Sequence, residues 1–180
     1  MTPQETSDLA RQAAAGNAQA FRRVVEAHYM MVYKVAYKWC GRREDAEDVA
    51  QEVFGKLPEK LKSFRGESAF STWLYRLTIN ASKDYYRTAG RARTRELPFA
   101  EGFDAPSDEV AADDALAAKQ AMGEIHRLPE GIRDAVLLVY AEELSHKEAA
   151  AVLGCAESTI SWRIFQARKS LKGLKERYAG

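Results

Sequence analysis

The sequence of 180 residues contains only two cysteines, Cys40 and Cys155, which stand far apart and form no CxxC pair. This spacing predicts neither a disulfide framework nor a zinc site. Apolar neighbours favour a buried thiol over a redox role at both positions. The three histidines, His28, His126 and His146, are too scattered to form a metal or catalytic cluster. We therefore expect no metal and no cofactor.

The sequence also lacks the patterns that accompany catalysis or membrane insertion. It shows no nucleophile–base pair, no phosphate-binding glycine loop and no metal-ligand spacing. It has no apolar run of 18 residues and no signal-peptide pattern at its N-terminus. These absences predict a protein that is not an enzyme, is not inserted in a membrane and is located in the cytoplasm.

Strand-like alternation of apolar and polar residues is absent, and helix-forming residues dominate throughout. The fold class is therefore expected to be all-α. Asn17 is placed to cap a first long helix, and Gly41 to end it. Apolar residues at steps of three and four predict further helices over 44–57, 72–88, 119–128, 132–140, 145–153 and 158–178. Pro58 is expected to start a separate short helical turn, and Gly90 is expected to close the helix at 72–88.

The net charge of +1 conceals two segments of opposite charge. Residues 96–118 hold seven acidic side chains, no Lys or Arg, and Pro98 and Pro106, which is typical of an exposed linker. Residues 158–177 hold six basic side chains and one acidic side chain. We therefore expect two small helical domains, 1–95 and 119–180, joined by a flexible acidic linker at 96–118, with a cationic surface on the second domain.

The C-terminal segment has the signals of a helix-turn-helix. Ser145 and Glu148 form a capping-box pattern, Gly154 stands at the turn, and Ser158 opens the second helix. In such a unit the second helix enters the major groove of DNA, and its first turns face base edges. The alternative is a basic helix in a small bundle with solvated charges. The expected contacts to DNA are Ser158, Thr159, Ser161, Trp162, Arg163, Phe165, Gln166, Arg168 and Lys169.

Three segments carry a resemblance to a known family: DAEDVAQEVF at 45–54, FRGESAFSTWLYRL at 64–77 and STISWRIFQAR at 158–168. The chain resembles the extracytoplasmic-function group of the sigma-70 family over nearly its whole length. The first two matches are long and specific, whereas the third is shared with other helix-turn-helix regulators. The resemblance implies that the two domains are sigma region 2 and sigma region 4.

Residues 44–57 are expected to form a helix with an acidic stripe opposite an apolar face. An exposed stripe of this kind can pair with a basic helix, although it can also be an ordinary solvated surface. The resemblance implies that it binds the clamp coiled coil in the largest subunit of core RNA polymerase. The residues expected to make this contact are Asp45, Asp48, Gln51, Glu52 and Phe54.

Residues 64–87 mix aromatic and basic side chains, the combination that holds single-stranded DNA. Trp73 and Leu77 fall on one face and are expected in the core. The resemblance implies that the loop around Gly66 receives a base flipped out of the −10 promoter element, and that the next helix lines the same groove. The expected contacts are Phe64, Arg65, Gly66, Glu67, Ser68, Ala69, Phe70, Asn80, Lys83, Tyr86 and Arg87.

The sequence departs from the family pattern at two places. Ile79 stands where many members have Arg before the residue matching Asn80, and Ser161-Trp162 stands where the −35 helix often has Lys-Ser. The promoter sequence of other members therefore cannot be transferred to this chain, and its DNA binding is expected to be weak without polymerase.

Together these segments predict a sigma factor that binds core RNA polymerase, recognises the −10 and −35 elements of promoter DNA in duplex and single-stranded form, and starts transcription. The resemblance implies control by an anti-sigma factor. The main rival is a helix-turn-helix regulator that binds duplex DNA alone, which leaves residues 45–54 and 64–87 without a role. A second rival is an adaptor that sequesters a partner without touching DNA.

Overall fold

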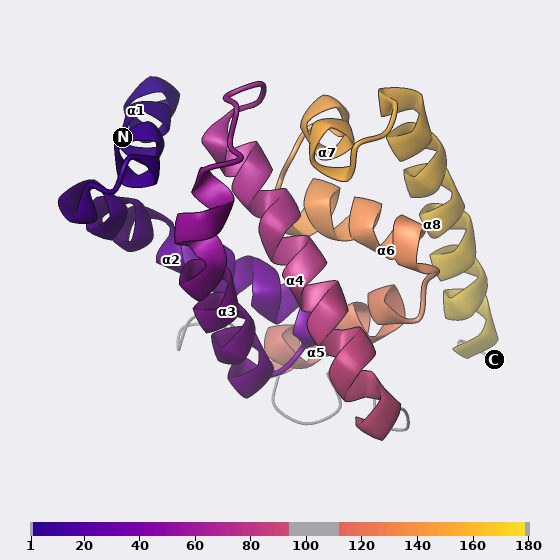
Figure 1. Cartoon of the computed structure of the whole chain (residues 1–180). Helices are drawn as coiled ribbons and strands as arrows, with labels where there is room; N and C mark the ends of the chain where they lie inside the picture. Colours follow the sequence, from indigo (N-terminus) through magenta and orange to yellow (C-terminus); the bar gives the residue numbers. More distant parts are fainter. Residues whose placement is uncertain (1, 94–111, 179–180) are drawn as a thin grey trace. The chain divides into compact units, whose positions relative to one another are not determined.

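The computed structural model describes residues 2–93 and 112–178, and within these ranges it contains helices and no strand (Figure 1). The all-α prediction is therefore confirmed. The chain divides into two compact units, Met1–Arg95 and Glu96–Gly180.

The first unit is built from four helices, α1 (Pro3–Ala14), α2 (Ala18–Cys40), α3 (Arg43–Leu61) and α4 (Phe70–Arg93). Helix α2 packs against each of the other three helices (Figure 1). Its buried side chains include Val24, Val32 and Cys40, and they meet Val49, Val53 and Leu57 of α3 in one hydrophobic core.

Helix α1 was not predicted from the sequence, although its N-terminal signal is present. Thr2 Oγ1 accepts the backbone N–H of Glu5 at 3.2 Å, and the Glu5 carboxylate accepts the backbone N–H of Thr2 at 2.7 Å. This capping box satisfies two of the donors that a helix leaves open at its start. The helix is then held by Leu9, Ala10 and Ala13, which are buried in the core of the unit.

Four of the predicted helix boundaries in this unit can be compared with the structure. Asn17 caps α2 as expected, since its side chain accepts the N–H of Ala20 at 3.0 Å, and Gly41 ends α2 with φ of 77°. Pro58 does not end α3, contrary to expectation. Proline removes one backbone donor from a helix, but Leu57 and Leu61 on either side are both buried, and this burial carries α3 through to Leu61. Helix α4 likewise continues past Gly90 to Arg93.

The second unit contains α5 (Ala112–His126), α6 (Glu130–Val136), a π-helical turn η1 (Leu137–Ala141), α7 (His146–Leu153) and α8 (Glu157–Tyr178). Helix α8 packs against α6 and α7, through Ile160, Ile164 and Ala167, all of which are buried. Residues 112–118 of the predicted linker are thus helical and belong to α5. The rest of that linker lies outside the described residues.

Candidate nucleic-acid interface

Helix α3 presents acidic side chains on the side opposite its buried residues, as predicted. Asp48 and Gln51 are exposed, whereas Ala46, Val49 and Val53 are buried. Glu52 is half-buried and forms an ion pair of 2.5 Å with Lys56, one helical turn further on. Asp48 is therefore the exposed carboxylate of this stripe, whereas the charge of Glu52 is partly compensated within the helix.

Asp45 does not belong to the exposed stripe, contrary to the sequence-based expectation. Its side chain is 7% exposed, and Asp45 Oδ1 accepts a hydrogen bond of 3.0 Å from the hydroxyl of Tyr85 on α4. The same hydroxyl lies 3.0 Å from Asp48 Oδ2. Tyr85 thus connects α4 to two carboxylates of α3. Asp45 acts inside the unit and is not placed to contact a partner.

The surface near Phe54 contains two apolar residues that the sequence reasoning missed. Phe54 is half-buried and stacks on Tyr29 of α2, with ring centroids 5.8 Å apart. Tyr29 is 39% exposed and its neighbour Met30 is 56% exposed. Both residues lie on the predicted helix 17–41 but off its buried face, which is the signal that could have identified them. An apolar patch therefore extends from Phe54 of α3 onto α2.

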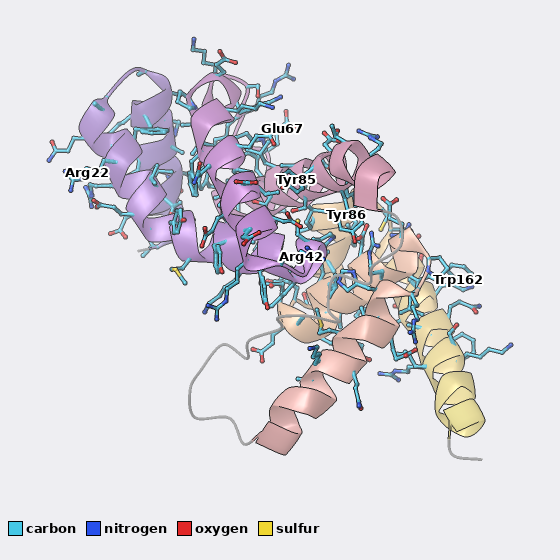
Figure 2. All side chains as sticks on the ribbon, turned by 90° about the horizontal axis from the view of Figure 1, so that it is seen from below. Arg22, Arg42, Glu67, Tyr85, Tyr86 and Trp162 are labelled. Carbon is cyan, nitrogen blue, oxygen red and sulfur yellow. The ribbon has the colours of Figure 1, made fainter. Side chains whose placement is uncertain are left out.

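The loop between α3 and α4 turns at Gly66, whose φ of 74° lies in the left-handed region that favours glycine. Arg65 and Glu67 on either side are highly exposed and stand 4.0 Å apart. Ala69 is also exposed, and Ser68 is half-buried. Figure 2 shows Glu67 on this loop. The predicted loop residues 65–69 are therefore together at one end of the unit and accessible to a ligand.

Phe64 and Phe70 flank this loop and pack beneath it. The ring of Phe70 lies 5.4 Å from that of Phe64 and 5.6 Å from that of Trp73, and His28 of α2 meets Phe70 edge-on at 5.2 Å. Phe70 is 1% exposed, so its ring lies in the core and not on the surface where the sequence placed a DNA contact. An apolar ring at this position is stabilised by burial. Phe70 anchors the loop instead, and half-buried Phe64 packs against it.

Along α4, the predicted groove residues lie on the side away from the core. Asn80, Tyr86 and Arg87 are exposed, Lys83 is half-buried, and Arg87 forms an ion pair with Asp84 on the same helix. Ile79 is 2% exposed. Ile79, which departs from the family pattern, is therefore a core residue and is not part of the exposed surface of α4.

The C-terminal helix-turn-helix has the predicted local structure. Ser145 Oγ accepts the N–H of Glu148 at 3.2 Å, and the Glu148 carboxylate accepts the N–H of Ser145 at 2.9 Å. The Ser145 hydroxyl also donates to Glu148 Oε2 at 2.6 Å, and this hydrogen bond, followed by the one from the Ser145 N–H, lowers the pKa of Glu148. Gly154 adopts φ of 64° at the end of α7, and α8 begins three residues later. The capping box and the glycine turn are both confirmed.

The predicted DNA-contacting residues of α8 divide into two groups around the buried face of that helix. Ser158, Ser161, Trp162, Phe165, Arg168 and Lys169 are exposed, whereas Thr159, Arg163 and Gln166 are half-buried. Trp162 is 56% exposed and Phe165 is 63% exposed, and Figure 2 shows Trp162 projecting from α8. The exposed surface of the first turns thus contains hydroxyls and aromatic rings, together with the carboxylate of Glu157.

Arg163 does not lie on that exposed surface. Its guanidinium packs over Gly131 of α6, where a Cβ atom would stand 3.2 Å from Arg163 Cζ. Arg168 lies on an outer face, but its guanidinium donates to the hydroxyl of Tyr140, at 2.8 Å from Nη2 and 3.2 Å from Nε. The expectation that Arg163 reads a base edge is therefore not supported by its position, because this side chain is turned toward α6.

The exposed side chain of Ser161 is held by a residue from α7. Ser161 Oγ lies 3.0 Å from His146 Nδ1 and 3.2 Å from the backbone oxygen of Glu157. His146 is half-buried, directly after the N-cap of α7. The sequence reasoning assigned no role to this histidine, and its separation of 15 residues from Ser161 gave no local signal.

Other chemistry is not indicated in the parts of the chain that the structure describes. Within residues 2–93 and 112–178 no group of three or more His, Cys, Asp or Glu could hold a metal ion. Burial raises the pKa of the Cys40 thiol to about 12, so this thiol is protonated at neutral pH, as expected for a buried cysteine. None of the helices described here is long and apolar enough to cross a membrane.

Two family models match the chain, and each falls within one of the two units. The model described as Sigma-70 region 2 matches residues 24–92, and the model described as Sigma-70, region 4 matches residues 119–171. The first range contains α3, the loop at Gly66 and most of α4, and the second contains the helix-turn-helix. Together the two models cover more than half of the chain.

Individual proteins are also similar to this chain over nearly its full length. The chain is 31% identical to the RNA polymerase sigma-H factor of Pseudomonas aeruginosa, over 95% of this chain and 94% of that protein. It is 32% identical to the ECF RNA polymerase sigma-E factor of Haemophilus influenzae, over 91% and 92% respectively. Its fold is similar to that of CnrH, solved in complex with the cytosolic domain of CnrY, with a TM-score of 0.69, 27% identity, and 95% of this chain and 97% of that chain covered.

Proposed function

Because this chain belongs to the extracytoplasmic-function group of the sigma-70 family, we propose that each of its two units recognises one of the two promoter elements while the chain is bound to RNA polymerase. The protein is a transcription initiation factor: it binds core RNA polymerase, recognises the −10 and −35 elements and starts transcription. It is not an enzyme, since the polymerase performs the chemistry. The observation that carries this function is the match of one unit to region 2 and of the other to region 4.

We assign residues 1–95 to region 2 and residues 119–180 to region 4, with the intervening segment 96–118 connecting them. The family models support this assignment because neither extends across the boundary at Arg95. Residues 112–118 continue into α5, so the connection is shorter than its acidic composition suggested.

For polymerase binding we propose the exposed surface of α3, with Asp48 as its central charge and Gln51 and Glu52 beside it. Phe54 with Tyr29 and Met30 adds an apolar contact at the edge of the same face. A mixed surface of this kind suits a basic helical partner, because the carboxylate selects a cation while the apolar patch supplies buried area. The partner would be the clamp coiled coil of the polymerase largest subunit.

For the −10 element we propose the loop Arg65–Ala69 as the receptor of an unpaired base. Exposed backbone around Gly66, which has no side chain, can approach a base closely. Asn80, Lys83, Tyr86 and Arg87 of α4 would follow the displaced strand through stacking and phosphate contacts. Phe64 and Phe70 would act from below by holding the loop in place.

For the −35 element we propose the exposed side of α8. Ser158, Ser161, Trp162 and Phe165 would face the base edges of the major groove, and Lys169 would contact the backbone. Thr159 and Gln166 stand at the margin of this surface, and Arg168 reaches it while bound to Tyr140. Arg163 would support α8 from its α6 side.

A protein partner that holds the factor inactive is part of the proposal. CnrH, which this chain resembles over nearly its whole length, was solved in complex with the cytosolic domain of a second protein. We propose that an anti-sigma factor regulates this chain in a comparable way and that the chain acts in the cytoplasm, where RNA polymerase works.

Binding to promoter fragments with and without core polymerase tests this function against the main rival. Specific binding of a promoter fragment is expected only when core polymerase is present. Tight, specific duplex binding by the chain alone, unchanged by core polymerase, would establish a stand-alone helix-turn-helix regulator instead. Capture of polymerase without any promoter binding would favour an adaptor.

A further inference from the structure

The helix-turn-helix contains a side-chain hydrogen bond between its two helices at the surface proposed to face DNA. His146 Nδ1 of α7 and Ser161 Oγ of α8 are 3.0 Å apart. Ser161 is exposed and stands where the family pattern often has a lysine. A serine hydroxyl has no positive charge, so Ser161 would contact DNA through hydrogen bonds that a lysine would not make.

The protons around Ser161 can be assigned by counting donors and acceptors. A serine hydroxyl has one proton and two lone pairs, and Ser161 Oγ is within reach of the Glu157 backbone oxygen at 3.2 Å as well as of His146 Nδ1. A carbonyl oxygen can only accept. If the hydroxyl donates to Glu157, then His146 Nδ1–H donates to Ser161 and two hydrogen bonds form. If the hydroxyl donates to His146, only one forms, and two oxygens face each other without a proton.

The arrangement with two hydrogen bonds is favoured, because each net hydrogen bond shifts such an equilibrium by about 2- to 12-fold. In that arrangement both the proton and one lone pair of Ser161 are already engaged inside the protein. The group that remains for a ligand is a single lone pair on an exposed oxygen, which is a hydrogen-bond acceptor.

We propose that His146 positions Ser161 as an acceptor that reads an exocyclic amine in the major groove, so that one position of the −35 element favours adenine or cytosine on the strand that Ser161 faces. Adenine N6 and cytosine N4 are the amine donors of the major groove, whereas guanine O6 and thymine O4 are acceptors and would meet the Ser161 lone pair unfavourably. The inference rests on the proposed function of α8.

The surroundings of Ser161 fit a reader that works without a positive charge. Arg163 is packed on Gly131, and its neighbour Trp162 presents an aromatic ring. The first turns of α8 therefore place no described basic side chain beside Ser161 that would select guanine. If the hydrogen bond between His146 and Ser161 only held α7 against α8, its loss would affect binding to all −35 sequences alike. If it positions Ser161 to read a base, its loss changes the preference at one position.

Promoter libraries test the assignment, with polymerase holoenzyme reconstituted from core enzyme and the full chain. A promoter randomised over the −35 element is transcribed by wild type and by Ser161→Ala, His146→Ala, the double variant and His146→Asn. Asparagine can place its Nδ2–H near the position of the imidazole Nδ1–H, so it retains the donor. Lys169→Ala serves as the control for a backbone contact, and thermal unfolding shows whether each variant is folded.

Wild type is expected to prefer adenine or cytosine by about 3- to 10-fold at one position, the range set by one hydrogen bond. Ser161→Ala and His146→Ala should each remove this preference at that position alone, the double variant should do no more, and His146→Asn should restore it. Lys169→Ala should weaken all sequences alike.

Three results would overturn the inference: no base preference that depends on Ser161, a loss in His146→Ala that is equal for all −35 sequences, or a change of preference in Ser161→Ala that His146→Ala does not share. These results differ from a failure of the proposed function, in which wild-type holoenzyme would make no promoter-specific transcript from any member of the library.

Discussion

Tyr85 Oη and Asp48 Oδ2 lie 3.0 Å apart, although 37 residues separate the two positions in the sequence. The same hydroxyl reaches the buried carboxylate of Asp45 at 3.0 Å. The helix proposed to bind polymerase, α3, is thereby attached to the helix proposed to follow the −10 strand, α4. Asp48 Oδ2 faces Tyr85, and the exposed remainder of this carboxylate is available to a basic partner.

Reversing the charge at Asp48 should abolish binding to core polymerase. In Asp48→Arg a cation would face the basic helix of the partner, and like charges at an interface disfavour association strongly. Glu26→Arg on α2 is the matched control, because Glu26 is exposed and forms its ion pair with Arg22 of the same helix. Co-purification with core enzyme measures both. Retention of Asp48→Arg at the wild-type level would show that this face of α3 is not the interface.

Removing the hydroxyl of Tyr85 should destabilise the first unit. Tyr85→Phe removes the single hydroxyl proton that lies between the two carboxylates, and hydrogen bonds to charged groups contribute roughly 1.5–3 kcal/mol, with the lower end expected at this partly exposed site. Urea unfolding measures the change in the free energy of unfolding. Tyr29→Phe, which alters an exposed tyrosine stacked on Phe54, is the control and should stay within about 0.5 kcal/mol of wild type. Equal stabilities for wild type and Tyr85→Phe would contradict the link.

The stabilisation by Tyr85 should be lost as the pH becomes alkaline. Burial, followed by the hydrogen bonds to Asp45 and Asp48, raises the pKa of Tyr85 in the folded state. A group with a raised folded pKa contributes stability that is complete below its unfolded pKa, about 10 for tyrosine, and that falls as the pH rises further. The stability difference between wild type and Tyr85→Phe should therefore be constant from about pH 7 to 9 and shrink above about pH 10. A difference that already changes near pH 7 would point to another titrating group.

Substituting Phe70 should affect folding more than base preference. Phe70→Leu keeps an apolar side chain but loses the ring contacts to Phe64 and Trp73, at a cost of roughly 1–1.5 kcal/mol. The melting temperature should fall by several degrees, while the base preference of the holoenzyme at −10 stays the same. Arg65→Ala, on the exposed loop, should show the opposite pattern. A wild-type melting temperature combined with an altered −10 preference in Phe70→Leu would place this ring in contact with DNA.

Truncating Arg163 should weaken DNA binding without relaxing its specificity. Arg163 packs over Gly131 and supports α8 from behind, so Arg163→Ala should lower the stability of the second unit and reduce affinity for all −35 sequences by a similar factor. Binding of holoenzyme to promoter variants measures this. A selective loss at a single base pair would restore Arg163 as a base reader, in which case a cost of about 1–3 kcal/mol is expected.

Features set by neighbouring residues could be predicted from the sequence. The cap at Asn17, the capping box of Ser145 with Glu148 and the turn at Gly154 all depend on contacts within three or four residues, and all are present. Helical spacing also predicts the positions of Asp48 and Glu52 on the outer side of α3, although not the burial of Asp45.

Features set by distant contacts could not be predicted in this way. Asp45 and Asp48 look equivalent in the sequence, but tertiary packing buries the first and leaves the second exposed, and the hydroxyl of Tyr85 on α4 reaches both. His146 acquires its role from Ser161 by the same kind of long-range contact. Arg163 is different, because Ile160, Ile164 and Ala167 mark the buried face of α8 and Arg163 lies beside it at helical spacing. Its orientation was therefore predictable, but its charge suggested a DNA contact instead.

Transcription by reconstituted polymerase tests the central claim most directly. Core RNA polymerase is incubated with the chain and with genomic promoter fragments, and the start sites of the transcripts are mapped. The account predicts transcripts that start at discrete sites downstream of a shared −35 and −10 pair and that disappear when the chain carries Asp48→Arg. Transcription that is no more specific than that of core polymerase alone, with the chain folded and present in excess, would contradict it.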